Sequence, residues 1–247
     1  MIGVLVPTIV LNQLFKQGNV QFDVSKLQWI GAPSNSPSVI AVWYQAPWTS
    51  WEAAKNQPLI IGAPSPTAPD ALAAYLINNL LNAKLKVVLG YLGGKEIEAA
   101  MERGEVHARA GQSWAGWTSS NPDWVSENKV IPILQMGSHL SPDLPDTPWL
   151  LDLVVQPEAK QIAELYVNTM AMDRPMVVGP HVPPERMTIL RAAYKQTMAD
   201  SEFLADAKKA HMQISPVTGE ELQDIVVRAT SLPSSVIQRG AQILQRN

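Results

Sequence analysis

The alternation of short apolar runs with longer amphipathic segments is the feature that most constrains the fold of this chain. The strands that this alternation predicts are short, and they occupy residues 2–6, 39–43, 59–62, 86–89, 106–110, 131–134 and 176–178. Segments with a helical spacing of apolar residues follow most of them. Because parallel strands need a crossover helix between them, the pattern predicts an α/β fold with a parallel sheet. The last part of the chain, from residue 184 onward, has mainly helical spacing of its apolar residues. Its helices must therefore pack on a sheet whose strands come from other parts of the chain.

Polar residues at the ends of these runs indicate where several helices begin. Thr8 can cap a helix that continues to Phe15, and residues 49–52 have the spacing of a capping box. Residues 67–70 open an amphipathic segment that extends to about residue 81.

Composition and charge exclude several classes of partner. The chain has 247 residues, of which 46% are apolar and 17% charged, enough for one large domain or two small lobes. The net charge is −3, whereas a protein that follows phosphate backbones carries a basic surplus, so we expect no nucleic-acid partner. The apolar runs are far shorter than the ~20 residues that cross a membrane, so we expect no direct membrane insertion.

The cysteine and histidine content of the chain gives no indication of a metal or cofactor site. There are no cysteines, and the four histidines are isolated, so neither a metal site nor a cofactor is expected. The first six residues are apolar but lack a basic region and a small-residue cleavage site, so we expect no signal peptide here.

One motif raises the alternative of an enzyme. Residues 111–116, GQSWAG, follow an expected strand and approach the G-x-S-x-G pattern of a nucleophile elbow. The second glycine comes one residue late. An α/β hydrolase-like enzyme with Ser113 as its nucleophile is therefore the alternative function, and a strand-to-helix turn with a polar cap is the simpler interpretation.

Three turns at expected strand ends are candidates for binding an anion. Residues 62–67, GAPSPT, lead from a strand into a helix, where free N–H groups and the positive end of the helix dipole favour a carboxylate. Because ligands gather at the carboxyl ends of strands in open α/β sheets, we expect these turns to face one cleft. The candidate ligand-binding residues are Pro7, Thr8, Ala63, Ser65, Thr67, Gln112 and Ser113.

Six segments stand out when they are taken in order along the chain: FDVSKLQWIG at 22–31, YLGG at 91–94, GEV at 104–106, LPDTP at 144–148, GPHVPPE at 179–185 and DSEF at 200–203. Together they resemble the substrate-binding proteins of tripartite tricarboxylate transporters. The resemblance covers essentially the whole chain. Each segment is a weak signal alone, and their order and spacing make the match specific.

This resemblance implies a type II periplasmic-binding fold, in which two α/β lobes hold a small organic acid between them. It also implies a periplasmic location, transport without catalysis, and membrane transporter subunits as partners. Family members often have an acidic residue followed by Asn where this chain has Gly111 and Gln112. The lack of an acid at that position disfavours an amino-bearing ligand.

The resemblance also implies a particular division of the chain. The run at 2–6 is similar to a family strand that normally comes some 60 or more residues later, so we expect an N-terminally truncated first lobe. Lobe one would comprise residues 1–44 and 174–247, and lobe two residues 45–173. A third possible function is then that of a truncated remnant that binds nothing.

Overall fold

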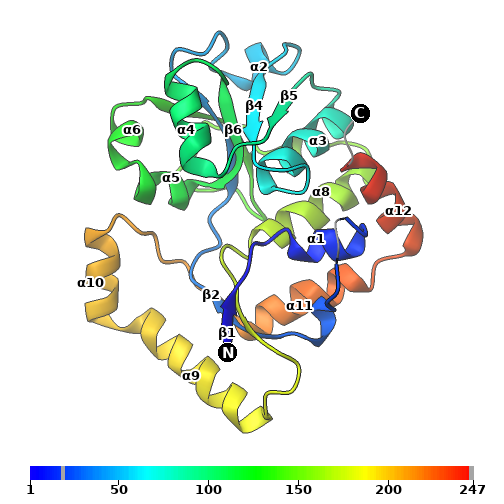
Figure 1. Cartoon of the computed structure of the whole chain (residues 1–247), viewed down its shortest axis with the longest axis vertical. Coiled ribbons are helices and arrows are strands. Elements are labelled where there is room, and N and C mark those ends of the chain that lie inside the picture. Colours follow the sequence, from blue (N-terminus) through cyan, green and yellow to red (C-terminus); the bar gives the residue numbers. More distant parts are fainter. Residues whose placement is uncertain (18–19, 245–247) are drawn as a thin grey trace.

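A computed structural model describes residues 1–17 and 20–244 of the chain. It contains two β-sheets that lie one above the other in Figure 1, each with helices packed against it. The lower sheet has four strands, which pair antiparallel throughout. In spatial order they are β1 (Ile2–Val4), β8 (Met176–Val178), β2 (Gln28–Ala32) and β9 (Val217–Thr218).

The upper sheet has five strands and is mixed. In spatial order they are β5 (Lys86–Leu89), β4 (Ile60–Ala63), β6 (Ala108–Ser113), β3 (Ser38–Trp43) and β7 (Val130–Met136). Only the pairs of β4 with β5 and with β6 are parallel, so the prediction of a parallel sheet is wrong for the other pairs. The reason is that β3 comes straight from the lower sheet without a crossover helix, and it enters between β6 and β7 in the opposite direction.

Helices cover both sheets. Those attached to the upper sheet are α2 (Trp51–Ala54), α3 (Pro69–Leu81), α4 (Gly94–Glu102), α5 (Trp114–Ser120), α6 (Pro122–Ser126) and α7 (Leu150–Leu153). Those near the lower sheet are α1 (Ile9–Leu14), the 3₁₀ turn Val24–Lys26, α9 (Pro184–Ala199), α10 (Ser201–Lys209) and α11 (Gly219–Thr230). Of the remaining two, α8 (Pro157–Met170) contacts α7 of the first group and α1 and α11 of the second, and α12 (Ser234–Ile243) contacts α3 and α8.

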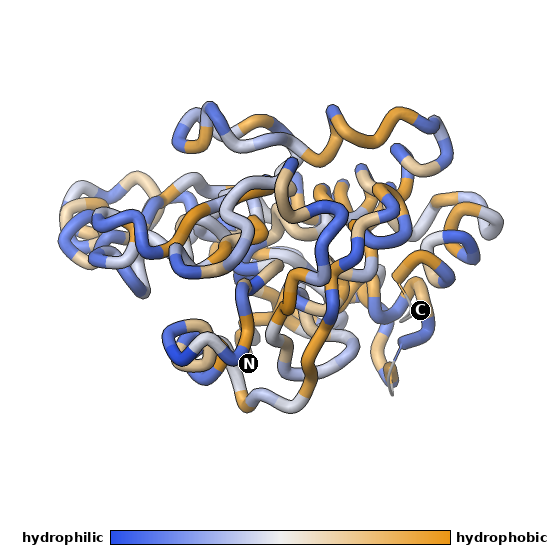
Figure 2. The backbone as a smooth tube through the Cα atoms, turned by 90° about the horizontal axis from the view of Figure 1, so that it is seen from above, coloured by the Kyte–Doolittle hydropathy of each residue, from blue (hydrophilic) through white to orange (hydrophobic). Residues whose placement is uncertain are grey.

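One hydrophobic core joins the two sheets. Its largest cluster takes Trp29 from β2, Ile40 from β3, Leu72 from α3 and Tyr166 from α8, and none of these four side chains is exposed. Hydrophobic and hydrophilic residues alternate over short distances along the chain (Figure 2), as expected for helices with one buried face. Among the described residues, no helix is both long and apolar enough to cross a membrane.

The chain passes between the sheets at two adjacent places. Segment 33–37 leads from β2 to β3, and segment 171–175 leads from α8 to β8; Ser34 and Asp173 form an antiparallel bridge between them. The N–H of Leu5 also donates to the carbonyl oxygen of Pro175, 3.0 Å away. These three segments therefore lie together between the two sheets.

The observed sheets bear on the expected lobe boundaries. Strands β1 and β8 are neighbours in the lower sheet, but β3 belongs to the upper one, so the chain leaves the lower sheet at 33–37 rather than after residue 44. A two-lobe division stays a prediction, with its first boundary moved to that segment. Helix α12, expected in lobe one, packs on α3, where Asn79 Nδ2 donates to the carbonyl of Ile243 at 2.8 Å.

Candidate functional site

A cavity of about 260 Å³ lies where the inter-sheet segments meet the strand ends of the upper sheet. Its walls come from the chain after β1, the start of β3, the turn before α3, the end of β6 and the segment after α8. The residues that line it are Leu5, Val6, Pro7, Ser38, Pro64, Pro69, Asp70, Arg109, Gly111, Gln112, Ser113, Met170, Asp173 and Arg174.

All three turns that the sequence singled out reach this cavity, but not through all the expected residues. Pro7, Gln112 and Ser113 line it, and the turn before α3 contributes Pro64. Four other candidates are not among the lining residues: Thr8, Ala63, Ser65 and Thr67.

The local contacts of these four residues explain their positions. Thr8 is 1% exposed and its hydroxyl makes no capping bond to α1, so that expected cap is wrong. Ala63 is fully buried in β4. The hydroxyls of Ser65 and Thr67 lie 3.4 Å apart, and α3 begins after Ala68 without a side-chain cap.

Ser113 is held by two hydrogen bonds at the junction of β6 and α5. Its Oγ accepts from the N–H of Gly116 at 3.1 Å, which caps α5, and donates to Asp173 Oδ2 at 3.0 Å. A serine nucleophile is normally hydrogen-bonded to an imidazole base. Neither partner of Ser113 is a histidine, so the contacts fit the polar-cap interpretation of the motif.

Asp173 and Arg174 line the cavity from the segment that returns to the lower sheet. Burial raises the pKa of the Asp173 carboxyl, and Arg174 and the Ser113 hydroxyl partly oppose this rise. Arg174 has a φ of 51°, the left-handed conformation that non-glycine residues rarely adopt, and its side chain is exposed. Such backbone conformations occur preferentially at functional sites.

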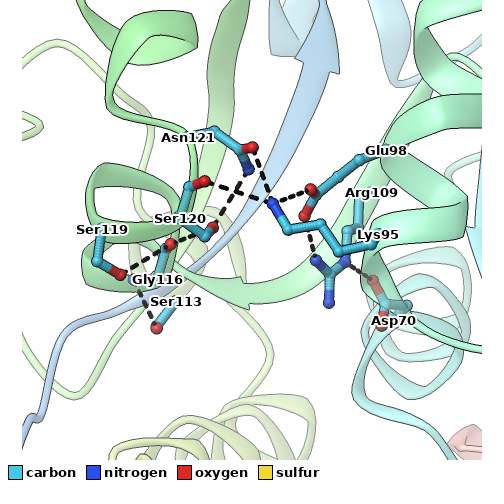
Figure 3. Close-up of polar contacts among 9 residues, drawn as sticks. All are labelled: Asp70, Lys95, Glu98, Arg109, Ser113, Gly116, Ser119, Ser120 and Asn121. Atoms are coloured by element: carbon cyan, nitrogen blue, oxygen red, sulfur yellow. Dashed lines mark hydrogen bonds and ion pairs between the residues drawn. The ribbon is translucent and has the colours of Figure 1, made fainter.

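A network of charges starts at the cavity wall with Asp70 and Arg109 and extends beside β6 (Figure 3). Arg109 Nε contacts Asp70 Oδ1 at 3.0 Å, and its Nη1 contacts Glu98 Oε1 at 2.9 Å. Lys95 Nζ in turn lies 2.8 Å from Glu98 Oε2 and donates to Asn121 Oδ1 at 3.0 Å. The network thus connects α3, β6, α4 and the end of α5.

Burial dominates the electrostatics of this network. Asp70 is 3% exposed, and desolvation raises the pKa of its carboxyl to about 6 even though Arg109 favours the ionised form. The single positive charge of Arg109 is shared by two buried carboxylates, so it does not fully offset the desolvation cost of either one. Within the described ranges, no group of His, Asp or Glu side chains is arranged to hold a metal ion.

Sequence reasoning missed five polar lining residues: Ser38, Asp70, Arg109, Asp173 and Arg174. One signal was available, because Arg109 stands between the apolar residues Ala108 and Ala110 of an expected strand, and a buried charge needs a partner. No local pattern marks Asp173 or Arg174, which reach the cavity only through the return of the chain between the sheets.

Comparison with solved structures identifies the fold. A TctC solute-binding protein from Polaromonas, without ligand, has a TM-score of 0.65 and 16% identity, over 96% of this chain and 77% of that one. Rpa4515 of R. palustris, solved with adipate, has a TM-score of 0.68 and 13% identity, over 98% and 76%. MatC from Rhodopseudomonas palustris, with bound malate, has a TM-score of 0.63 and 13% identity, over 99% and 78%.

The fold is that of the periplasmic solute-binding proteins. This confirms the α/β periplasmic-binding fold expected from the sequence resemblance, and the similar proteins include a TctC protein. No model of a protein family matches the sequence, and comparison with curated proteins gives no match.

Proposed function

We propose that this protein captures a small organic acid in the cavity between its two sheets, without transforming it chemically. It would serve in the periplasm as the solute-binding component of a tripartite tricarboxylate-type transporter. The observation that carries the proposal is the position of the cavity. Asp173 and Arg174 come from a segment that joins the sheets, whereas Gln112 and Ser113 end a strand of the upper one. A ligand that contacts both pairs would hold the two halves together, as in the hinge closure of periplasmic binding proteins.

The groups at the cavity wall suit a carboxylate. The guanidinium of Arg174 has no carboxylate within ion-pair distance in the described part of the chain, so it can pair with a ligand anion. The amide of Gln112, engaged by no other described residue, offers donors as well. The first turn of α3 also borders the cavity through Pro69 and Asp70, with the positive end of its dipole. Two proteins of the same fold hold dicarboxylic acids, adipate and malate.

Thermal and chemical unfolding in the presence of organic acids tests the proposal. A panel of mono-, di- and tricarboxylates and amino acids would include adipate and malate. A ligand present at about 100 times its Kd raises the free energy of unfolding by about 2.7 kcal/mol. A panel in which no acid changes the stability, with calorimetry that detects no binding, would refute the proposal.

A pair of arginine variants tests the site itself. Arg174→Gln removes the cation from the cavity wall and should weaken binding of the best acid about tenfold or more, because a charge-assisted bond contributes about 1.5 kcal/mol or more. Arg186→Gln is the matched control, since Arg186 is exposed on α9 and does not line the cavity. Equal affinities of the two variants would place the ligand elsewhere.

A further inference from the structure

The charges that line the cavity are balanced, and this limits the ligand. Two acids, Asp70 and Asp173, and two bases, Arg109 and Arg174, border it. Arg109 is already engaged by Asp70 and Glu98, and Glu98 is also paired with Lys95. The two acids Asp70 and Glu98 and the two bases Lys95 and Arg109 therefore neutralise one another. The charges left for a ligand are the carboxylate of Asp173 and the guanidinium of Arg174.

Among the described residues, none forms an ion pair with Asp173. One of its oxygens accepts the hydroxyl hydrogen of Ser113 at 3.0 Å, which is an uncharged donor. Arg174 favours the ionised carboxyl through the field of its charge, but the two side chains form no ion pair. A partly buried carboxylate at a cavity wall attracts a cation and repels an anion.

From this arrangement we infer that the captured acid also carries an ammonium group, so that the ligand is a small amino acid. This inference rests on the proposed function. Asp173 receives the ammonium group, and Arg174 with Gln112 receives a carboxylate. A plain dicarboxylate would instead bring two negative charges to a wall that has one unpaired cation and one unpaired anion.

The inference reverses an expectation from the sequence. The absence of an acid at Gly111 and Gln112 disfavours an amino-bearing ligand, but the fold brings Asp173 to the neighbouring Ser113, 60 residues away in the chain. The cavity volume of about 260 Å³ suits a small molecule of this kind rather than a peptide.

Isothermal titration of the full chain with matched pairs of acids decides the question. The pairs are propionate and alanine, succinate and aspartate, and glutarate and glutamate, whose members differ by the amino group. We expect the best amino acid to bind at least tenfold more tightly than its partner. A plain acid that binds as tightly as its amino counterpart would overturn the inference and leave the proposed function standing. No binding by any acid in these pairs or in the wider panel would overturn both.

A variant pair then assigns the selectivity to Asp173. Asp173→Asn keeps the shape and removes the charge, so the tenfold preference for the amino member should disappear. Asp146→Asn, at an exposed position that does not line the cavity, should keep it. Retention of the preference in a folded Asp173→Asn protein would contradict the role of Asp173. If that variant fails to fold, the acid pairs measured on the unaltered protein still decide the inference.

Discussion

Gly111 lies so close to Pro69 that a β-carbon at position 111 would come within 2.5 Å of the Pro69 carbonyl carbon. The strand end of β6 thus packs directly against the first residue of α3. Gly111 also has a φ of 78°, a conformation that L-residues with side chains rarely adopt. This close approach sets the first turn of α3, with Asp70, beside Arg109 and the cavity.

Replacement of Gly111 by alanine should therefore be strongly destabilising. Backbone strain and overpacking each cost about 1 to 3 kcal/mol, so we expect the free energy of unfolding to fall by about 2 to 6 kcal/mol. Gly104→Ala is a matched control, because Gly104 has a φ of 72° but a β-carbon there would meet no atom within 4 Å. The Gly104→Ala variant should lose about 1 to 2 kcal/mol of stability from backbone strain alone. Urea unfolding of both variants measures the difference, and equal losses would contradict the packing argument.

Loss of the shared arginine should also be costly. Arg109→Gln leaves Asp70 and Glu98 buried without their common cation, and breaking a buried ion pair in this way costs about 3 to 5 kcal/mol. Arg103→Gln removes a pair with Glu105 in which both side chains are at least half exposed, and it should cost less than about 1 kcal/mol. Chemical unfolding of the two variants at neutral pH provides the comparison. A loss of under 1 kcal/mol in Arg109→Gln would show that the buried network contributes little.

The raised pKa of Asp70 predicts a specific dependence of stability on pH. The pKa of this carboxyl rises from 3.8 to about 6 in the folded protein, so the folded state binds the proton more tightly than the unfolded state. The resulting stabilisation is complete below about pH 4 and is lost as the pH rises through about 6. Asp70→Asn isolates this contribution: the stability of the unaltered protein relative to the variant should fall between pH 4 and 7. A difference between the two proteins that stays flat over this pH range would contradict the shifted pKa of Asp70.

The strand-end turns differ in their expected contribution to binding. Thr67 does not line the cavity and its hydroxyl lies beside Ser65, so Thr67→Val should leave the Kd for the best acid within about twofold. Gln112→Leu removes a donor from the cavity wall and should raise that Kd about tenfold. Calorimetric titration of both variants with the same acid tests the difference. A larger change in Kd for Thr67→Val than for Gln112→Leu would contradict this site and would place the ligand nearer the start of α3.

Much of the fold could be predicted because its signals are local. Short apolar runs bounded by polar turns mark the strands, and Ser113 caps the helix that follows it. The capping box expected at 49–52 is one residue off, because Ser50 rather than Thr49 caps α2 by accepting from the N–H of Ala53. The antiparallel insertion of β3 could not be predicted in this way. An apolar run has the same appearance whichever way it pairs, and only the direct connection from the lower sheet fixes the direction of β3.

The sequence by itself determined the order of most strands and helices, the polar turns at Pro7 and at Gln112 and Ser113, and the resemblance to solute-binding proteins. It did not predict strands β2 and β9 of the lower sheet. The tertiary structure alone decided which charges meet at the cavity. Arg109 is paired with Asp70, 39 residues earlier, and Ser113 with Asp173, 60 residues later. The spacing along the chain encodes neither contact, because each depends on how β6 packs against α3 and on where the chain returns between the sheets.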